Sequence, residues 1–109
     1  NWGFAAEHLF AAECLARNYH VYRSLNPGSK WDFIVNGKNV DVKGIGEGVR
    51  PRGHLHSLGD YRVDIVAVCR MSQKKWYIVP RSKLPEGKNI SFTWSRHGEW
   101  VGRWGLLDA

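Results

Sequence analysis

The chain has 109 residues, of which 43% are hydrophobic and 24% are charged, a composition that excludes disordered and fibrous proteins and is typical of an ordinary globular domain. This length predicts one domain over residues 1–109, large enough to bury a core without disulfides. No apolar run approaches the roughly 20 residues that span a bilayer, so we expect neither a membrane segment nor a signal peptide.

The balance of charges indicates the class of partner. Lys and Arg outnumber Asp and Glu by 16 to 10, which gives a formal net charge of +6 at pH 7. An excess of this sign favours a polyanionic partner such as nucleic acid, although many small basic domains bind no polyanion.

Two rare residue types bear on the setting of the chain. Cys14 and Cys69 lie in apolar contexts without the spacing of a zinc site or a disulfide framework, so we expect buried free thiols and a reducing, cytoplasmic location. The only methionine is Met71, so we expect the chain to have lost its initiator residue or to belong to something longer.

The first predicted element is a helix over Trp2–Asn18. The segment is rich in Ala, Leu and Glu, and Asn18 suits a helix C-cap. On a helical wheel Glu7 falls inside the apolar arc, which consists of Phe4, Phe10, Ala11, Cys14 and Leu15.

Three strands are predicted next. The first is His20–Leu25, closed by an Asn-Pro-Gly turn, and the other two flank Asn36-Gly37 in the segment 30–44, KWDFIVNGKNVDVKG. Asn-Gly predicts a two-residue type I′ turn, which fixes the register of this hairpin. One face then consists of Trp31, Phe33, Val35, Val40 and Val42, and the other of Lys30, Asp32, Asp41 and Lys43.

In this register Asp32 lies directly opposite Asp41. At about 5 Å and an effective dielectric constant of about 20, two such charges repel by on the order of 3 kcal/mol. Either Lys30 and Lys43 or a divalent cation held by both carboxylates would offset this repulsion. An ordinary solvated face with diagonal salt bridges therefore stays open beside a metal site.

The rest of the chain gives weaker signals. The segment 44–61 has five glycines and no clear periodicity, so it stays unassigned, with a short helix or strand around His54–Leu58. Val63–Cys69 is nearly all apolar and predicts a strand covered on both faces. Further predicted elements are a strand at Lys75–Val79, a strand at Ile90–Trp94 and a closing helix at Trp100–Leu107.

Together these features resemble the PD-(D/E)xK nuclease superfamily, with its restriction-endonuclease-like fold. Asp32 matches the first acid of the motif, Asp41 and Lys43 match its acid-x-Lys pair, and Glu7 matches the acid that many members carry on the first helix. The resemblance is to compact members, similar to Holliday-junction resolvases and intron-encoded homing endonucleases, and WYIVPRSKLP adds to it. It implies an α/β fold with a helix, a three-stranded antiparallel meander, a connecting segment, two further strands and a mixed central sheet flanked by helices.

The function implied by the resemblance is a metal-dependent DNA endonuclease that leaves 5′-phosphate and 3′-hydroxyl ends. Asp32, Asp41, Glu7 and the carbonyl of Val42 would hold Mg²⁺, with Mn²⁺ as an alternative, and Lys43 would orient or activate the attacking water. The substrate would be duplex or branched DNA. Because one small domain reaches one strand at a time, we also expect a homodimer.

Contacts to DNA phosphates are expected from the basic residues outside this site. The candidates are Lys30, Arg50, Arg52, His54, His56, Lys74, Lys75 and Arg81. Two alternatives remain: a nucleic-acid-binding module of the same fold without catalysis, and a basic partner-binding domain whose hairpin face is ordinary surface.

Overall fold

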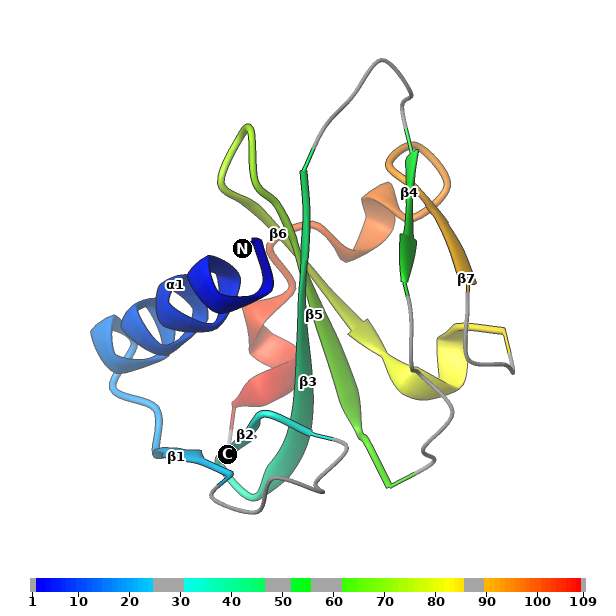
Figure 1. Cartoon of the computed structure of the whole chain (residues 1–109). Helices are drawn as coiled ribbons and strands as arrows, with labels where there is room; N and C mark the ends of the chain where they lie inside the picture. The colour runs from blue at the N-terminus through cyan, green and yellow to red at the C-terminus, as the bar shows by residue number, and fades with distance from the viewer. Residues whose placement is uncertain (1, 25–30, 47–51, 56–61, 86–89, 109) are drawn as a thin grey trace.

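A five-stranded mixed sheet runs through the centre of the structure, a computed structural model that describes residues 2–24, 31–46, 52–55, 62–85 and 90–108 (Figure 1). The strand order is β1-β2-β3-β5-β6, with bounds Val21–Arg23, Phe33–Val35, Lys38–Ile45, Ile65–Arg70 and Lys75–Pro80. β3 and β5 are parallel, and the other neighbours are antiparallel. The predicted α/β order of a helix, a meander and two further strands is confirmed.

Helix α1 (Trp2–Ala16) covers one face of this sheet. Residues Ala6, Phe10 and Cys14 are fully buried at a spacing of four, and Asn18, with φ 61°, ends the helical segment as predicted. Two residues of the predicted apolar arc do not face the core: Phe4 and Leu15 are 62% and 63% exposed. These two residues lie about 80° and 100° round the helix from Cys14, beyond the stripe that meets the sheet.

The sheet separates two hydrophobic cores. On the helix side, α1 packs against alternate residues of the strands, among them Val40, Val42 and Ala67. On the other side, Val66, Val68 and Tyr77 pack under Phe92 and Trp94. The predicted strand covered on both faces is therefore confirmed, since β5 contributes to both cores.

The layer on this second side differs from the prediction that helices flank the sheet. In the described residues it is a two-stranded antiparallel sheet of β4 (Arg52–Leu55) and β7 (Ile90–Thr93). β4 thus gives the unassigned segment 44–61 a strand, and β7 confirms the strand predicted near Ile90.

The predicted closing helix is replaced by two short 3₁₀ helices, η2 (Gly98–Trp100) and η3 (Trp104–Leu107). Gly102, with φ 68°, lies between them in the left-handed region and interrupts the helical path. Trp100 packs against the second core, whereas Trp104 belongs to the first. The prediction of one closing helix is therefore wrong, because Trp100 and Trp104 face different cores.

Both cysteines are free and buried, as predicted. Burial raises the pKa of the Cys14 thiol to about 12 and that of the Cys69 thiol to about 11, so neither is a reactive thiolate. No helix in the described ranges is long and apolar enough to cross a membrane.

Candidate active site

The β2–β3 hairpin has the turn predicted from its sequence. Asn36 and Gly37 have φ values of 47° and 84°, and the strands pair Val35 with Lys38, Ile34 with Asn39 and Phe33 with Val40. The Asn36 side chain fixes the turn, since its Oδ1 accepts from the His20 N–H at 3.0 Å and its Nδ2 donates to the Leu107 carbonyl at 2.8 Å. The hairpin is therefore anchored from both sides.

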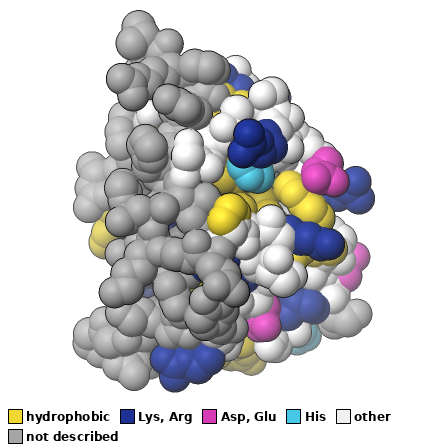
Figure 2. Space-filling model, turned by 90° about the vertical axis from the view of Figure 1, so that its right-hand side faces the viewer, with side chains coloured by type: hydrophobic (Ala, Val, Ile, Leu, Met, Phe, Trp, Pro, Cys, Tyr) yellow, Lys and Arg dark blue, Asp and Glu magenta, His cyan; other side chains and the backbone are white. Residues whose placement is uncertain are grey.

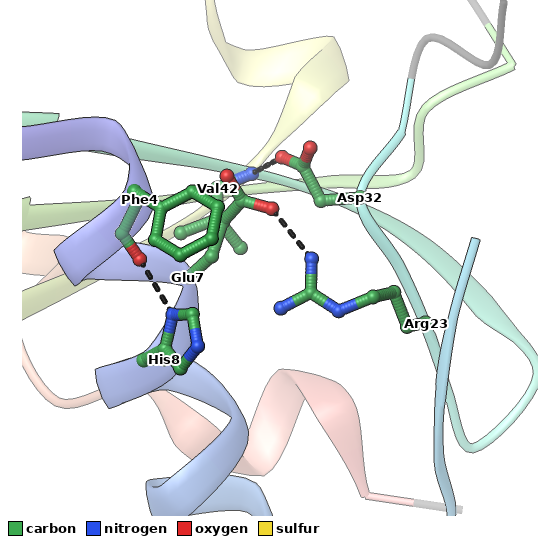
Figure 3. A network of polar contacts seen from close by, with 6 residues as sticks. All are labelled: Phe4, Glu7, His8, Arg23, Asp32 and Val42. Atoms are coloured by element: carbon green, nitrogen blue, oxygen red, sulfur yellow. Dashed lines mark hydrogen bonds and ion pairs between the residues drawn. The ribbon is translucent and has the colours of Figure 1, made fainter. Parts of the chain in front are cut away.

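Asp32 lies where the β2–β3 ladder ends. Its N–H donates to the Val40 carbonyl at 2.9 Å, and its Oδ2 accepts from the Val42 N–H at 2.7 Å (Figure 3). The carboxylate therefore takes the place of a strand acceptor. In a β-strand the N–H and C=O of one residue point to the same side. The Val42 carbonyl, which was predicted as a metal ligand, therefore points to the side of β3 on which Asp32 lies.

Two details of the predicted hairpin faces change. The strand pairing stops at Phe33 and Val40, so Asp32 meets Asp41 through its side chain and not as a ladder partner. Trp31 was predicted on the face of Phe33, yet it packs against the second core. Both changes follow from the bend at Asp32, which turns the chain out of the strand.

Asp41 is the most perturbed acid of the hairpin. It is 5% exposed and lies on β3, two residues before Lys43 and paired with the buried Val66 of β5. Its pKa is raised to about 8, mainly by burial; the Lys43 ammonium lowers the pKa, while the hydrogen bond and charge of Asp32 add to the rise. The Lys43 Nζ lies 3.4 Å from Asp41 Oδ2.

This donor set fits a hard divalent cation. Asp32 and Asp41 supply two carboxylates in mutual contact, and Mg²⁺ commonly takes one or two carboxylates together with water. Within the described ranges, no three His, Cys, Asp or Glu side chains come together at one metal position. Glu7 therefore does not join Asp32 and Asp41 as a third direct ligand. If Glu7 contributes to metal binding, as predicted, it does so through a water molecule.

Glu7 approaches the site from α1. Its carboxylate is half-buried and accepts from Arg23 Nη1 at 2.9 Å. Figure 3 shows the carboxylate pointing from the helix towards Asp32 and Val42, with the Arg23 guanidinium facing it. Arg23 was not among the predicted site residues, although it lies in the strand predicted at His20–Leu25.

The predicted DNA contacts are only partly described. Lys30, Arg50 and His56 lie outside the described residues, and the backbones of Arg52 and His54 form β4. Lys74 and Lys75 are exposed at the start of β6. In the described part of the face in Figure 2, basic side chains are mixed with acidic ones.

Arg81 corrects the prediction. It is 5% exposed, and its Nη1 donates to the carbonyls of Leu84 at 3.4 Å and Pro85 at 3.1 Å. Because Arg81 is buried and held to carbonyls of the turn around η1 (Arg81–Lys83), it is not presented to a phosphate at the surface. We therefore assign Arg81 a structural role.

Comparison with known proteins shows the fold and no closer relationship. No family model matches the sequence, and no curated protein matches it. The bacterial homing endonuclease I-Ssp6803I superposes with a TM-score of 0.76 at 15% identity, over 97% of this chain and 88% of its own. The Holliday junction resolvase Hjc of the archaeal hyperthermophile Archaeoglobus fulgidus superposes with a TM-score of 0.70 at 16% identity, over 98% and 96%.

One of these structures is a homing endonuclease and the other a Holliday junction resolvase, and the chain shares their restriction-endonuclease-like fold. The resemblance predicted from the motif residues is thereby confirmed at the level of the fold. At these identities the activity of either protein does not transfer with the fold.

Proposed function

We propose that the chain is a Mg²⁺-dependent DNA endonuclease that hydrolyses phosphodiester bonds to 5′-phosphate and 3′-hydroxyl ends. Asp32, Asp41 and the Val42 carbonyl would hold the ion, and Lys43 would act on the attacking water. The fold shared with a homing endonuclease and a Holliday junction resolvase supports this reaction class by analogy.

The observation that carries the proposal is the state of Asp41. A buried carboxyl group with a pKa raised to about 8, in contact with a second carboxyl and a lysine, is typical of a functional site. A core strand gains no stability from this arrangement, because apolar residues of similar size would pack there without a desolvation cost. A bound divalent cation would compensate both carboxylates.

In the proposed hydrolysis, the metal ion and Lys43 have different roles. Bound Mg²⁺ would lower the pKa of its water and offset charge on the phosphate. Lys43, 3.4 Å from Asp41 Oδ2, can donate hydrogen bonds to the attacking water or to a phosphate oxygen. The water gives up a proton to solvent as its oxygen forms a bond to phosphorus, the P–O3′ bond breaks, and the departing O3′ takes a proton from solvent.

The proposed substrate is duplex or branched DNA. Lys74 and Lys75 are exposed and are proposed to contact phosphates with the other basic residues named above, Arg81 excepted. Such contacts grip the backbone without reading sequence. A homodimer is proposed because two sites related by a twofold axis would reach both strands.

A cleavage assay tests the proposal. End-labelled duplex, single-stranded and four-way-junction DNA are incubated with the protein and Mg²⁺, then with EDTA, and the termini are identified by their reaction with ligase and phosphatase. We expect cleavage that EDTA abolishes and that Asp41→Asn and Lys43→Gln lose. Cleavage that persists in both folded variants would contradict the assignment.

A nucleic-acid-binding module without catalysis is the second candidate. The position of Lys43 favours it, since an ammonium 3.4 Å from Asp41 Oδ2 lowers the cost of a charged Asp41 without a metal. Tight DNA binding with no cleavage of any substrate in Mg²⁺ or Mn²⁺ would support this alternative.

A further inference from the structure

Arg23 joins helix α1 to the strand that follows Asp32. Its Nη1 lies 2.9 Å from Glu7 Oε1, and its guanidinium carbon lies 4.8 Å from the centre of the Phe33 ring. Phe33 is buried and directly follows Asp32, so the ring holds the guanidinium against a fixed part of the core. The Arg23 side chain is 44% exposed and that of Glu7 22%, so Arg23 covers the acid from the solvent side.

The backbone ties the same residues together. Arg23 is paired with Phe33 in the β1–β2 ladder, and the next residue, Ser24, donates its N–H to the Asp32 carbonyl at 2.9 Å. Asp32 in turn accepts from the Val42 N–H at 2.7 Å. The partner of Glu7 and the first hairpin acid are therefore held by one pair of strands.

We propose that Arg23 is a positioning residue, which holds the Glu7 carboxylate beside Asp32 so that it strengthens Mg²⁺ binding by the hairpin acids. This inference rests on the proposed function. The ion pair engages Glu7 Oε1, so Oε2 would remain to accept a hydrogen bond from a water of the ion when Mg²⁺ is bound. Figure 3 shows this carboxylate turned towards the strand residues, as the role requires.

Two effects of Arg23 on a nearby cation have opposite signs. The positive charge of Arg23 repels Mg²⁺, but the side chain is nearly half exposed, so water and salt screen this repulsion. Fixing Glu7 favours the cation, and loss of an outer partner of a metal site typically costs about 10- to 100-fold in affinity. Positioning therefore outweighs repulsion, and we expect loss of Arg23 to weaken Mg²⁺ binding by about tenfold.

Arg17 provides a matched control. Like Arg23 it pairs with a glutamate of α1, Glu13 at 3.5 Å, and stacks on a buried aromatic ring, Trp104 at 4.6 Å. Neither Arg17 nor Glu13 contacts the hairpin acids in the interactions described above. Arg17→Gln should therefore leave Mg²⁺ affinity unchanged.

The test is a calorimetric titration of Mg²⁺ into the protein without DNA, for wild type, Arg23→Gln, Glu7→Gln and the double variant. We expect Arg23→Gln to weaken binding about tenfold in the wild-type background and to have no further effect when Glu7 is Gln. Arg23→Lys, which keeps the charge, should recover most of the affinity. Arg23→Met, which keeps an apolar stem next to Phe33 but cannot pair with Glu7, replaces Arg23→Gln in the cycle if that variant fails to fold by circular dichroism.

Unchanged or tighter binding in Arg23→Gln, or an equal loss in the presence and absence of Glu7, would overturn the inference. Failure of the wild-type protein to bind Mg²⁺ at all would instead overturn the proposed function. The two failures are therefore distinguishable in one set of titrations.

Discussion

The Lys43 ammonium lies 3.4 Å from the Asp41 carboxylate, two residues earlier on the same face of β3. This ion pair is the internal compensation for an acid that is 5% exposed. It counteracts the effect of burial on the Asp41 pKa without cancelling it, since that pKa stays raised to about 8.

Asp41 makes the stability of the protein depend on pH. Its pKa is about 8 in the folded chain against an ordinary value of 3.8, so over this interval the folded state keeps a proton that the unfolded chain has lost. This contribution is fully present below the lower value and is lost as the pH rises through the upper one. Chemical denaturation between pH 4 and pH 9 should show the fall.

The Asp41→Asn variant should remove this dependence. At pH 8 we expect its free energy of unfolding to exceed that of wild type by about 1 to 3 kcal/mol, since the buried charge is gone. Glu13→Gln, at an exposed acid of α1, serves as the control and should follow wild type. A wild-type protein that becomes steadily more stable from pH 4 to pH 8 in this comparison would contradict the prediction.

Lys43→Gln should separate binding from chemistry. We expect the cleavage rate to fall by about 10²- to 10³-fold, while DNA affinity at fixed salt changes little. The Asp41 pKa should rise further, because the ammonium that lowers it is removed, and NMR titration of the carboxyl carbon measures this shift. Lys38→Gln, at the other end of β3, is the matched control and should keep full activity.

Asp32 has a structural and a proposed catalytic role that two substitutions separate. Asp32→Ala leaves the Val42 N–H without its 2.7 Å acceptor, so we expect a loss of about 1 to 3 kcal/mol in the free energy of unfolding. Asp32→Asn keeps an oxygen acceptor and should fold nearly as well, but lose Mg²⁺-dependent cleavage. Equal destabilisation of both variants in urea denaturation would be inconsistent with this division.

The hairpin turn limits what residue 37 can be. A Cβ at Gly37 would meet no atom within 4 Å, so Gly37→Ala causes no steric clash with other residues. Its cost in stability comes only from the strain of an alanine backbone at φ 84°. We expect a loss of about 1 kcal/mol in the free energy of unfolding. Gly98→Ala is the control, since it is equally open and has no positive φ. A similar loss in both variants would point away from backbone conformation.

Exposed lysines should set the salt dependence of DNA binding. Lys75→Gln and Lys74→Asn, chosen because Asn tolerates the φ of 51° at residue 74, should each reduce the slope of log K against log salt by about one. Fluorescence anisotropy at several salt concentrations measures the slopes. If both variants have the same slope as wild type, Lys74 and Lys75 do not contact DNA phosphates.

Local chemistry explains what could be predicted from the sequence. The Asn36-Gly37 turn requires positive φ at both positions, and this requirement predicts the hairpin register without reference to tertiary contacts. The alternation around it placed Asp41 and Lys43 on one face, as observed. These signals lie within fifteen residues of one another.

What the sequence did not reveal depends on distant contacts. Asp41 is buried and paired with Val66 of β5, a strand that reaches β3 only after a long connection. The Glu7–Arg23 ion pair joins a helix to a strand, and neither residue type alone indicates a partner. Arg81 follows a strand like a surface residue, yet it bonds to carbonyls of its own turn.

The most direct test of the site is a calorimetric titration of Mg²⁺ at pH 7 in buffers of different ionisation enthalpy. If Asp32 and Asp41 hold the ion, wild type should bind Mg²⁺ at one site and release about one proton, because Asp41, with a pKa of about 8, must lose its proton to become a ligand. Asp41→Asn should lose both the binding and the proton release. Binding with the same affinity and proton count in Asp41→Asn would contradict the site, as would the absence of binding in wild type.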